Sequence, residues 1–323
     1  MIGETAVDYL GIDIGKLQLH AALLQGDRIA RKSVSNNVTG FEQLVKWLSN
    51  REIQELHICL EATGSYGDSV AEYLHDQGHR VSVVNPMQTK SFGQSELIRT
   101  KTDKVDAGMI ARFCRAIKPP AWNPGSAEIR AFRAMVRRRE TLTQMIASEK
   151  NRLEAAIEPA VKRSISSTIA ALRDELKRLA SDIDGHLDAN PDLSEMVKRL
   201  DELPGFGSLT AQKVIAETKG FSVCDTRQGI VAFAGMNPRQ SQSGKRDLRG
   251  RITKIGNAAL RKGLFFAAMA AKRSSPYFRS FVARLEAAGK RPKVIIVALM
   301  RKLLILAFTL VSRNTRFNPA HAA

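Results

Sequence analysis

The chain has 323 residues, of which 44% are apolar and 25% charged, and its formal net charge is +18. This length is sufficient for two or three domains with hydrophobic cores, and the composition excludes a disordered chain, a collagen and a disulfide scaffold. The three cysteines, Cys59, Cys114 and Cys224, are far apart and odd in number, so they give no zinc spacing and suit a reducing compartment. Since residues 1–10 show no secretory signal, we expect a cytoplasmic protein.

The first part of the chain predicts a mixed α/β sheet covered by helices. Three short strands follow one another, which is typical of an antiparallel meander, and strands then alternate with helices. Helices are expected from Thr39, a plausible N-cap, and over residues 69–75 and 104–116. The predicted strands are residues 9–13, 18–24, 29–34, 56–60 and 80–84.

Four acidic residues occupy positions in this part that could hold a metal ion. Asp13 and Glu61 each end a predicted strand, where a buried carboxylate is costly unless it is paired or bound to metal. Asp103 and Asp106 are three residues apart on a predicted helix and therefore share a face. Four such oxygen donors suit Mg²⁺ or Mn²⁺, and a two-metal site of this kind supports phosphodiester displacement. Taken singly, a strand-end Asp is more often a turn cap than a metal ligand, and a pair of Asp residues three apart on a helix more often belongs to a solvated surface.

A change of composition separates this part from the rest of the chain. Residues 119–125 (PPAWNPG) predict a linker. Two long helical patterns follow, over residues 129–157 and 165–183, and the second has apolar residues at alternating steps of four and three, the spacing of a coiled-coil seam. The two helices could form an antiparallel hairpin that dimerises the protein, or they could simply pack within one chain.

The last 123 residues contain most of the positive charge. Residues 201–323 have 22 basic and 6 acidic side chains, a net charge of +16, which favours a nucleic-acid partner over a merely solvated basic face. The sequence LPGFG at residues 203–207 lies between two short helical patterns and resembles a helix-hairpin-helix, whose glycines let backbone N–H groups approach a phosphate. An ordinary turn between two helices is the alternative. The apolar segment near residues 294–311 is interrupted by Arg301 and Lys302, which favours a buried helix over a membrane span.

Glycines and cationic residues alternate between residues 233 and 261, an arrangement that could gather N–H groups and positive charge around a phosphate. Ser243 precedes Gly244 in this segment. A serine nucleophile needs an activating group, and no histidine lies between His186 and His321, so activation would have to come from a metal held by the carboxylates. On the residues alone, Ser243 is better explained as a turn residue than as a nucleophile.

Seven ordered motifs resemble the insertion-sequence transposases related to the Piv/MooV DNA invertase. The resemblance covers nearly the whole chain, and its motifs are GIDIGK at 11–16, CLEATGSY at 59–66, VVNP at 83–86, RTKTDKVDA at 99–107, LPGFG at 203–207, FAGMNPRQSQSG at 233–244 and RGRITKIGNAALR at 249–261. It implies a RuvC-like, ribonuclease-H-fold domain at residues 1–118, a linker and coiled-coil hairpin at 119–190, and a mainly helical, basic transposase domain at 191–323.

The same resemblance implies the chemistry. Mg²⁺ or Mn²⁺ would be held by an Asp-Glu-Asp-Asp tetrad, which corresponds here to Asp13, Glu61, Asp103 and Asp106, and Ser243 would attack DNA to form a phosphoserine. Donor and target double-stranded DNA, a noncoding bridge RNA that pairs with both, and a homo-oligomer, dimer or tetramer, are the implied partners. Because the acids and the serine lie in separate domains, we expect a composite site formed within one subunit or across an oligomer.

Three other functions fit parts of the sequence. The motif GIDIGK also resembles the first phosphate loop of sugar kinases and actin-like ATPases, although the later half lacks a second such motif. A RuvC-like nuclease or junction resolvase would use the acids without a covalent intermediate. A nucleic-acid-binding protein without enzymatic activity would use the same acids only as partners of lysine or arginine.

Overall fold

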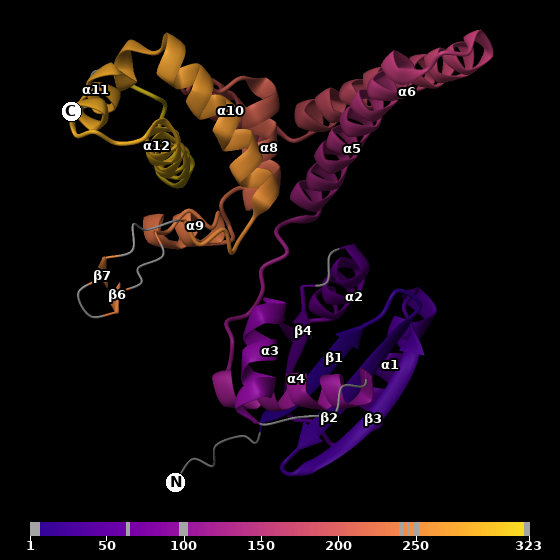
Figure 1. Cartoon of the computed structure of the whole chain (residues 1–323). Helices are drawn as coiled ribbons and strands as arrows, with labels where there is room; N and C mark the ends of the chain where they lie inside the picture. Colours follow the sequence, from indigo (N-terminus) through magenta and orange to yellow (C-terminus); the bar gives the residue numbers. More distant parts are fainter. Residues whose placement is uncertain are drawn as a thin grey trace. The chain divides into compact units, whose positions relative to one another are not determined.

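A computed structural model describes residues 7–62, 65–96, 103–238, 242–243, 246–247 and 252–319 (Figure 1). The chain divides into two compact units, Met1–Pro124 and Gly125–Ala323. The first boundary falls within the predicted linker. The second unit includes both long helices, and the further division at residue 190 stays a prediction.

The first unit is built on a five-stranded mixed sheet, as the sequence predicted. Its strand order is β3-β2-β1-β4-β5. The first three strands form the expected antiparallel meander, while β4 and β5 run parallel to β1. The strands are β1 (Val7–Ile14), β2 (Gln18–Gln25), β3 (Arg28–Ser35), β4 (Glu55–Glu61) and β5 (Arg80–Val84).

Helices cover both faces of this sheet. Helices α1 (Val38–Ser49) and α2 (Ser65–Asp76) pack on one face, and α4 (Asp103–Ile117) packs on the other, with α3 (Pro86–Ser95) against α4. The expectation that Thr39 caps α1 is wrong. The N-cap is Asn37, whose Oδ1 accepts a hydrogen bond from the Gly40 N–H at 2.9 Å, because an asparagine side chain reaches the first free amides of a helix.

The first residues of the linker run along β5, an edge strand of the sheet. The Trp122 N–H donates to the carbonyl oxygen of Val81 on β5 at 2.7 Å. The buried Ser82 hydroxyl lies 2.8 Å from the Pro120 carbonyl oxygen and 2.8 Å from Nε2 of His57. The chain is therefore fastened to β5 before it leaves the first unit.

The second unit is mainly helical. Helices α5 (Ala127–Ala155) and α6 (Pro159–Ala189) lie side by side as the predicted hairpin, with Ile169 and Ile183 of the seam buried inside the chain (Figure 1). Dimerisation through this hairpin stays a prediction. The remaining elements are α7 (Pro191–Asp201), α8 (Ser208–Thr218), α9 (Arg227–Phe233), β6 (Gln242–Ser243), β7 (Arg246–Asp247), α10 (Ala258–Ser274), a short 3₁₀ turn at Pro276–Phe278, α11 (Arg279–Ala287) and α12 (Pro292–Ser312).

Helix α12 occupies the core of the second unit. By length and composition it is apolar enough to cross a membrane, and in the described chain it is the one helix that passes this test. Half of its most apolar 18-residue window is buried in the protein, and its buried side chains include Leu299, Leu303 and Phe308, which belong to the largest hydrophobic cluster. The packing agrees with the expected buried C-terminal helix.

Candidate functional site

Two of the predicted acids lie on neighbouring strands, Asp13 one residue before the end of β1 and Glu61 at the end of β4. In the parallel pairing of β1 with β4, Ile12 lies opposite Leu60, so Asp13 and Glu61 come next on their strands. Ile12 and Leu60 belong to the core under α1 and α2. Because side chains alternate along a strand, Asp13 and Glu61 point to the other face, which α4 covers. This register places the two acids at the same end of the sheet, although Asp13 is not the last residue of its strand as the sequence predicted.

Close packing brings α4 onto the same face. A Cβ atom at Gly11 would lie 2.2 Å from the carbonyl oxygen of Ala107 and 2.4 Å from the amide nitrogen of Ala111. Only a residue without a side chain permits this approach. Ala107 directly follows Asp106, and Gly11 is two residues before Asp13 on the same strand face. The contact therefore fixes Asp106 near the edge that Asp13 and Glu61 occupy.

Glu61 is held by a neighbour that the sequence did not indicate. The Thr89 hydroxyl on α3 donates to Oε1 of Glu61, and it also lies 3.0 Å from the Pro86 carbonyl oxygen. Helix α3 starts at the VVNP motif, where the Asn85 side chain accepts a hydrogen bond from the Met87 N–H at 2.9 Å. The motif therefore ends β5, begins α3 and places Thr89 against the acid.

A second unpredicted residue joins the two loops at this edge. The Asn36 side-chain amide donates to the carbonyl oxygens of Gly15 and Tyr66, each at 3.0 Å. Gly15 directly follows β1, two residues after Asp13, and Tyr66 is the second residue of α2, the element that follows Glu61 in the chain. One side chain thus ties together the segments that follow both acids.

Cationic and hydroxyl side chains lie beside Asp13 on the same face. His20 of β2 pairs with Asp13 of β1 in the strand register, and its Nδ1 lies 2.9 Å from the Ser33 hydroxyl of β3. His20 and Ser33 line a hollow of about 160 Å³ together with Arg31 and Ala107. The strand pairing was needed to find this group, because in the sequence the histidine has no acidic neighbour.

The four acids suit a hard divalent cation by the chemistry of their oxygen donors. The side chains that the structure describes include those of Asp13, Glu61 and Asp106, and among the described side chains no three His, Cys, Asp or Glu residues are close enough together to hold a metal ion. The side chain of Asp103 lies outside the described part, although its backbone begins α4. Strand register and helix packing gather the backbones of Asp13, Glu61 and Asp106, and the assignment of a metal to them stays a proposal.

Ser243 lies on a two-stranded ribbon in the second unit. It is the last paired residue of β6, and its partner in β7 is Arg246. Residues 244 and 245, which link the strands, and the Ser243 side chain lie outside the described part. The ribbon belongs to a longer loop between α9 and α10 whose two ends are paired at Pro238 and Ile252.

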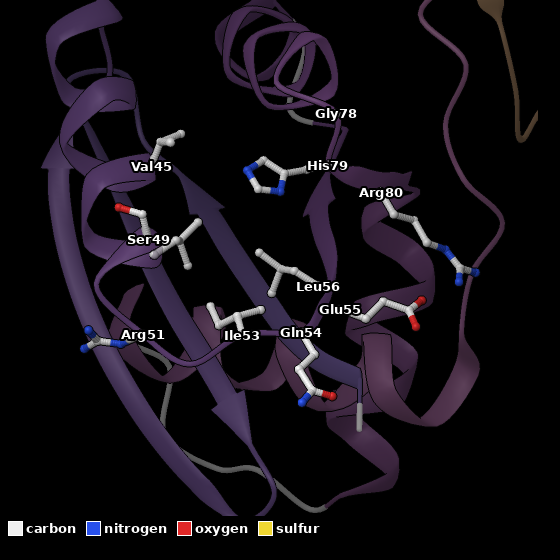
Figure 2. A pocket seen from close by; sticks show the side chains of 11 residues that line it. Val45, Ser49, Arg51, Ile53, Gln54, Glu55, Leu56, Gly78, His79 and Arg80 are labelled. Atoms are coloured by element: carbon white, nitrogen blue, oxygen red, sulfur yellow. The ribbon is translucent and has the colours of Figure 1, made fainter. Parts of the chain in front are cut away.

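A larger described pocket lies far from these acids within the first unit. Figure 2 shows it at the strand ends opposite to Asp13 and Glu61, where β4 begins at Glu55 and β5 at Arg80. Its volume is about 460 Å³, and burial lowers the pKa of His79, which lines it. The pocket contains none of the predicted site residues.

The second unit presents a basic, aromatic face on α10. This helix has no acidic residue, and its exposed side forms what we call the α10 outer face. Phe266 is 63% exposed there. Exposed aromatic rings between cations are typical of nucleic-acid surfaces. The α10 outer face consists of Lys262, Phe265, Phe266, Met269 and Arg273.

Residues 203–207 connect α7 and α8, which fits both the predicted helix-hairpin-helix and the alternative of an ordinary turn between two helices. Gly207 is the N-cap of α8 and makes no side-chain hydrogen bond to it. The predicted role of this hairpin in binding phosphate stays a prediction.

Comparison with known proteins identifies the family. Residues 10–160 match a family model described as a transposase, of the DEDD type, and residues 197–283 match a model of the IS116/IS110/IS902 transposase family. The chain is 31% identical over 314 residues to the pilin gene-inverting protein of Moraxella bovis, covering 96% of this chain and 97% of that protein. A transposase for the insertion sequence element IS1328 of Yersinia enterocolitica is 23% identical, over 97% of this chain and 99% of that one. The chain belongs to the IS110-type family of DEDD transposases and DNA invertases.

Proposed function

We propose that the protein is the recombinase of an insertion sequence and that it cuts DNA with a metal site on the first unit and a serine on the second. Asp13, Glu61, Asp103 and Asp106 would hold Mg²⁺ or Mn²⁺, and Ser243 would be the nucleophile. The observation that carries this proposal is the placement of two strand-end acids and α4 on one face, with Gly11 against Ala107. Bound there, the metal would supply positive charge to the scissile phosphate and to the oxygens that react.

The strand transfer can be written with the chain's own groups. The Ser243 hydroxyl oxygen forms a bond to the phosphorus, and the bond from that phosphorus to a deoxyribose oxygen breaks. The hydroxyl proton passes to a base, and the departing oxygen takes up a proton. Attack by the hydroxyl of another DNA end on the phosphoserine reverses these steps and releases the serine. The number of phosphodiester bonds is unchanged, so no external energy source is required.

The nucleic acid would bind mainly to the second unit, whose residues 201–323 have a net charge of +16. Phosphates would contact Lys262 and Arg273 of the α10 outer face, and an unpaired base would stack on Phe266. Next to the acids, Arg31 and His20 would face a further phosphate of the cleaved strand. The resemblance of the motifs extends this proposal to a bridge RNA that pairs with donor and target DNA. Isolation of the protein with an RNA from the noncoding flank of its gene would test that part.

A trapping experiment tests the covalent step. The full-length protein is mixed with DNA from both ends of its element, the flanking transcript and Mg²⁺, and adducts that survive denaturant are separated by size. We expect an adduct with the wild type and with the matched control Ser241→Ala, and none with Ser243→Ala. Cleavage by Ser243→Ala without an adduct would instead support a metal-dependent nuclease or junction resolvase. Cleavage that persists in Asp106→Asn would argue against the metal site.

Because the acids and the serine belong to different units, the site could be completed by a second subunit. Mixing Asp13→Ala protein with Ser243→Ala protein tests this arrangement. Partial recovery of adduct formation would support a site shared between subunits. Lack of recovery would support a site completed within one chain.

A further inference from the structure

The second unit contains a buried acid outside the predicted site. Glu217 on α8 is 2% exposed. Its carboxylate accepts two hydrogen bonds from Arg137 on α5, from Nε at 2.9 Å and from an Nη at 3.0 Å. It accepts a third from Nδ2 of Asn257 at 2.7 Å. Burial raises the pKa of Glu217, but the hydrogen bonds from Arg137 and Asn257 and the charge of Arg137 outweigh it, so the pKa lies below its ordinary value and the group is charged.

Asn257 connects this acid to the loop that contains Ser243. Its backbone N–H donates to the carbonyl oxygen of Phe233, the last residue of α9, at 2.8 Å. Its Oδ1 accepts a hydrogen bond from the Leu260 N–H at 2.8 Å and so caps α10. Its Nδ2 is the donor to Glu217. One residue therefore joins the end of α9, the start of α10 and the buried carboxylate.

Backbone hydrogen bonds join the two ends of this loop just before Asn257 in the chain. The Lys254 N–H donates to the Gly235 carbonyl oxygen at 3.1 Å, and the Thr253 N–H donates to the Asn237 carbonyl oxygen at 2.9 Å. Gly256 has a φ of 144°, and a Cβ atom there would lie 2.4 Å from the Phe233 carbonyl oxygen, so no other residue fits without displacement. We call the residues that these contacts join the loop base: Phe233, Gly235 and Asn237 at one end of the loop and Thr253, Lys254 and Gly256 at the other. The part of the loop that includes Ser243 starts and ends at this loop base.

We infer that the hydrogen-bonded bridge from Arg137 through Glu217 to Asn257 positions the loop base, and with it Ser243, for attack on DNA. This inference rests on the proposed function of Ser243. Glu217 and Asn257 are positioning residues, since they are argued to act on Ser243 through the loop base. The bridge also links the helix pair α5 and α6 to that loop. A shift of a nucleophile by about 1 Å can slow a reaction about 100-fold, so the position of the base has a direct effect on rate.

Two single substitutions and their combination test the bridge. Asn257→Asp keeps a good helix cap but replaces the donor with oxygens that repel Glu217. Glu217→Gln removes the charge that Arg137 needs. Each should slow single-turnover adduct formation per folded molecule about 10- to 100-fold, with DNA affinity nearly unchanged. In the double variant the amide of the new Gln at position 217 can donate to the carboxylate of the new Asp at position 257. This reverses the direction of the original hydrogen bond, so part of the rate should be recovered. The matched control is Glu140→Gln, which weakens the contacts of Glu140 with Lys213 of α8 at 2.7 Å and with Lys262 of α10 at 3.4 Å. Because Lys262 belongs to the α10 outer face, this variant is compared at saturating DNA, where its rate should be nearly unchanged.

Hydrogen exchange of the free full-length protein gives a readout that does not depend on activity. The amides of Thr253, Lys254 and Asn257 should exchange faster in both single variants than in the wild type or in Glu140→Gln. If these amides exchange as in the wild type, or if the adduct forms at the wild-type rate, the positioning role is overturned. If the Ser243→Ala variant forms the adduct, the proposed nucleophile is wrong, and the exchange rates still show whether the bridge orders the loop base.

Discussion

The acids of the first unit are placed by backbone packing, whereas the serine loop of the second unit is placed by side chains. Strand register puts Asp13 beside Glu61, and a glycine lets α4 lie against β1. The base of the serine loop depends instead on a buried carboxylate with an arginine and an asparagine around it. The first arrangement contains no ionisable group in its key contact, so we expect it to fail by steric change. The second should fail when a charge is removed.

The largest expected effect comes from the steric contact. Gly11→Ala would place a methyl group 2.2 Å from a backbone oxygen that cannot rotate away, so α4 must shift. We expect the substitution to lower the free energy of unfolding of the first unit by about 3 kcal/mol relative to the wild type. We also expect it to slow DNA cleavage by more than about 100-fold. Urea unfolding and the adduct assay measure these effects. The control is Gly185→Ala on α6, where a Cβ atom would meet nothing within 4 Å. A Gly11→Ala protein with wild-type cleavage would show that the contact does not place the acids.

The charged bridge makes a prediction about acid stability. The pKa of Glu217 is lowered in the folded chain, so its ionisation stabilises the second unit above the ordinary value of 4.5, and this contribution is lost as the pH falls through the folded pKa. Arg137 is 43% exposed, which limits the effect. We expect Glu217→Gln to lower the free energy of unfolding by about 2 kcal/mol at pH 7. The difference from the wild type should shrink below pH 4.5. A difference that is constant from pH 7 to pH 3 would contradict this origin.

Much of the first unit could be predicted from the sequence because its signals are local. The strands of the meander, the alternation that follows and the helix over residues 104–116 all have clear periodicity, and the structure has them within two residues of the predicted bounds, except that α2 begins four residues earlier than predicted. Helix α3 was missed because its ten residues have little amphipathic pattern after an Asn-Pro start. The N-cap of α1 was misplaced by two residues because Asn37 and Thr39 are both good caps in the sequence. The hydrogen bond from the Gly40 N–H to the Asn37 side chain, which identifies the cap, is visible only in the structure.

Residues of the candidate site could be predicted only where the residue type and its local sequence position indicate a role by themselves. Strand-end carboxylates are conspicuous, so Asp13 and Glu61 could be named at once. Thr89, Asn36 and His20 could not, because their roles depend on which strands and loops meet. Glu217 was equally hidden, since nothing in a helical sequence distinguishes a buried acid from a solvated one until its partners are known.

The hydroxyl beside Glu61 gives a smaller test of the first unit. Thr89→Val keeps the shape of the side chain but removes the hydrogen bond to the Glu61 carboxylate. Groups that hold a metal ligand typically change affinity or activity about 10- to 100-fold, and we expect the lower end, because the backbone contact at Gly11 remains. Titration of cleavage with Mg²⁺ should show a weaker apparent affinity. Thr143→Val, which removes a hydroxyl that donates to the Arg139 carbonyl oxygen in its own helix, should titrate like the wild type. Equal Mg²⁺ curves for Thr89→Val and the wild type would detach Thr89 from the metal site.

The smallest expected effect concerns the α10 outer face. It distinguishes a charge that binds DNA, on Arg273, from a charge that positions the serine loop, on Glu217. Arg273→Gln should weaken DNA binding about two- to fivefold at moderate salt and reduce the slope of log affinity against log salt by about 1, because one phosphate contact releases about one counterion. Adduct formation at saturating DNA should be unchanged, in contrast to Glu217→Gln, which should slow the reaction and leave the salt slope unchanged. Arg178→Gln on α6, where the arginine pairs with Glu175 at 2.7 Å, is the control and should alter neither quantity. If Arg273→Gln leaves the salt slope at its wild-type value, the DNA does not lie along α10, and the positive charge of the second unit must act through another surface.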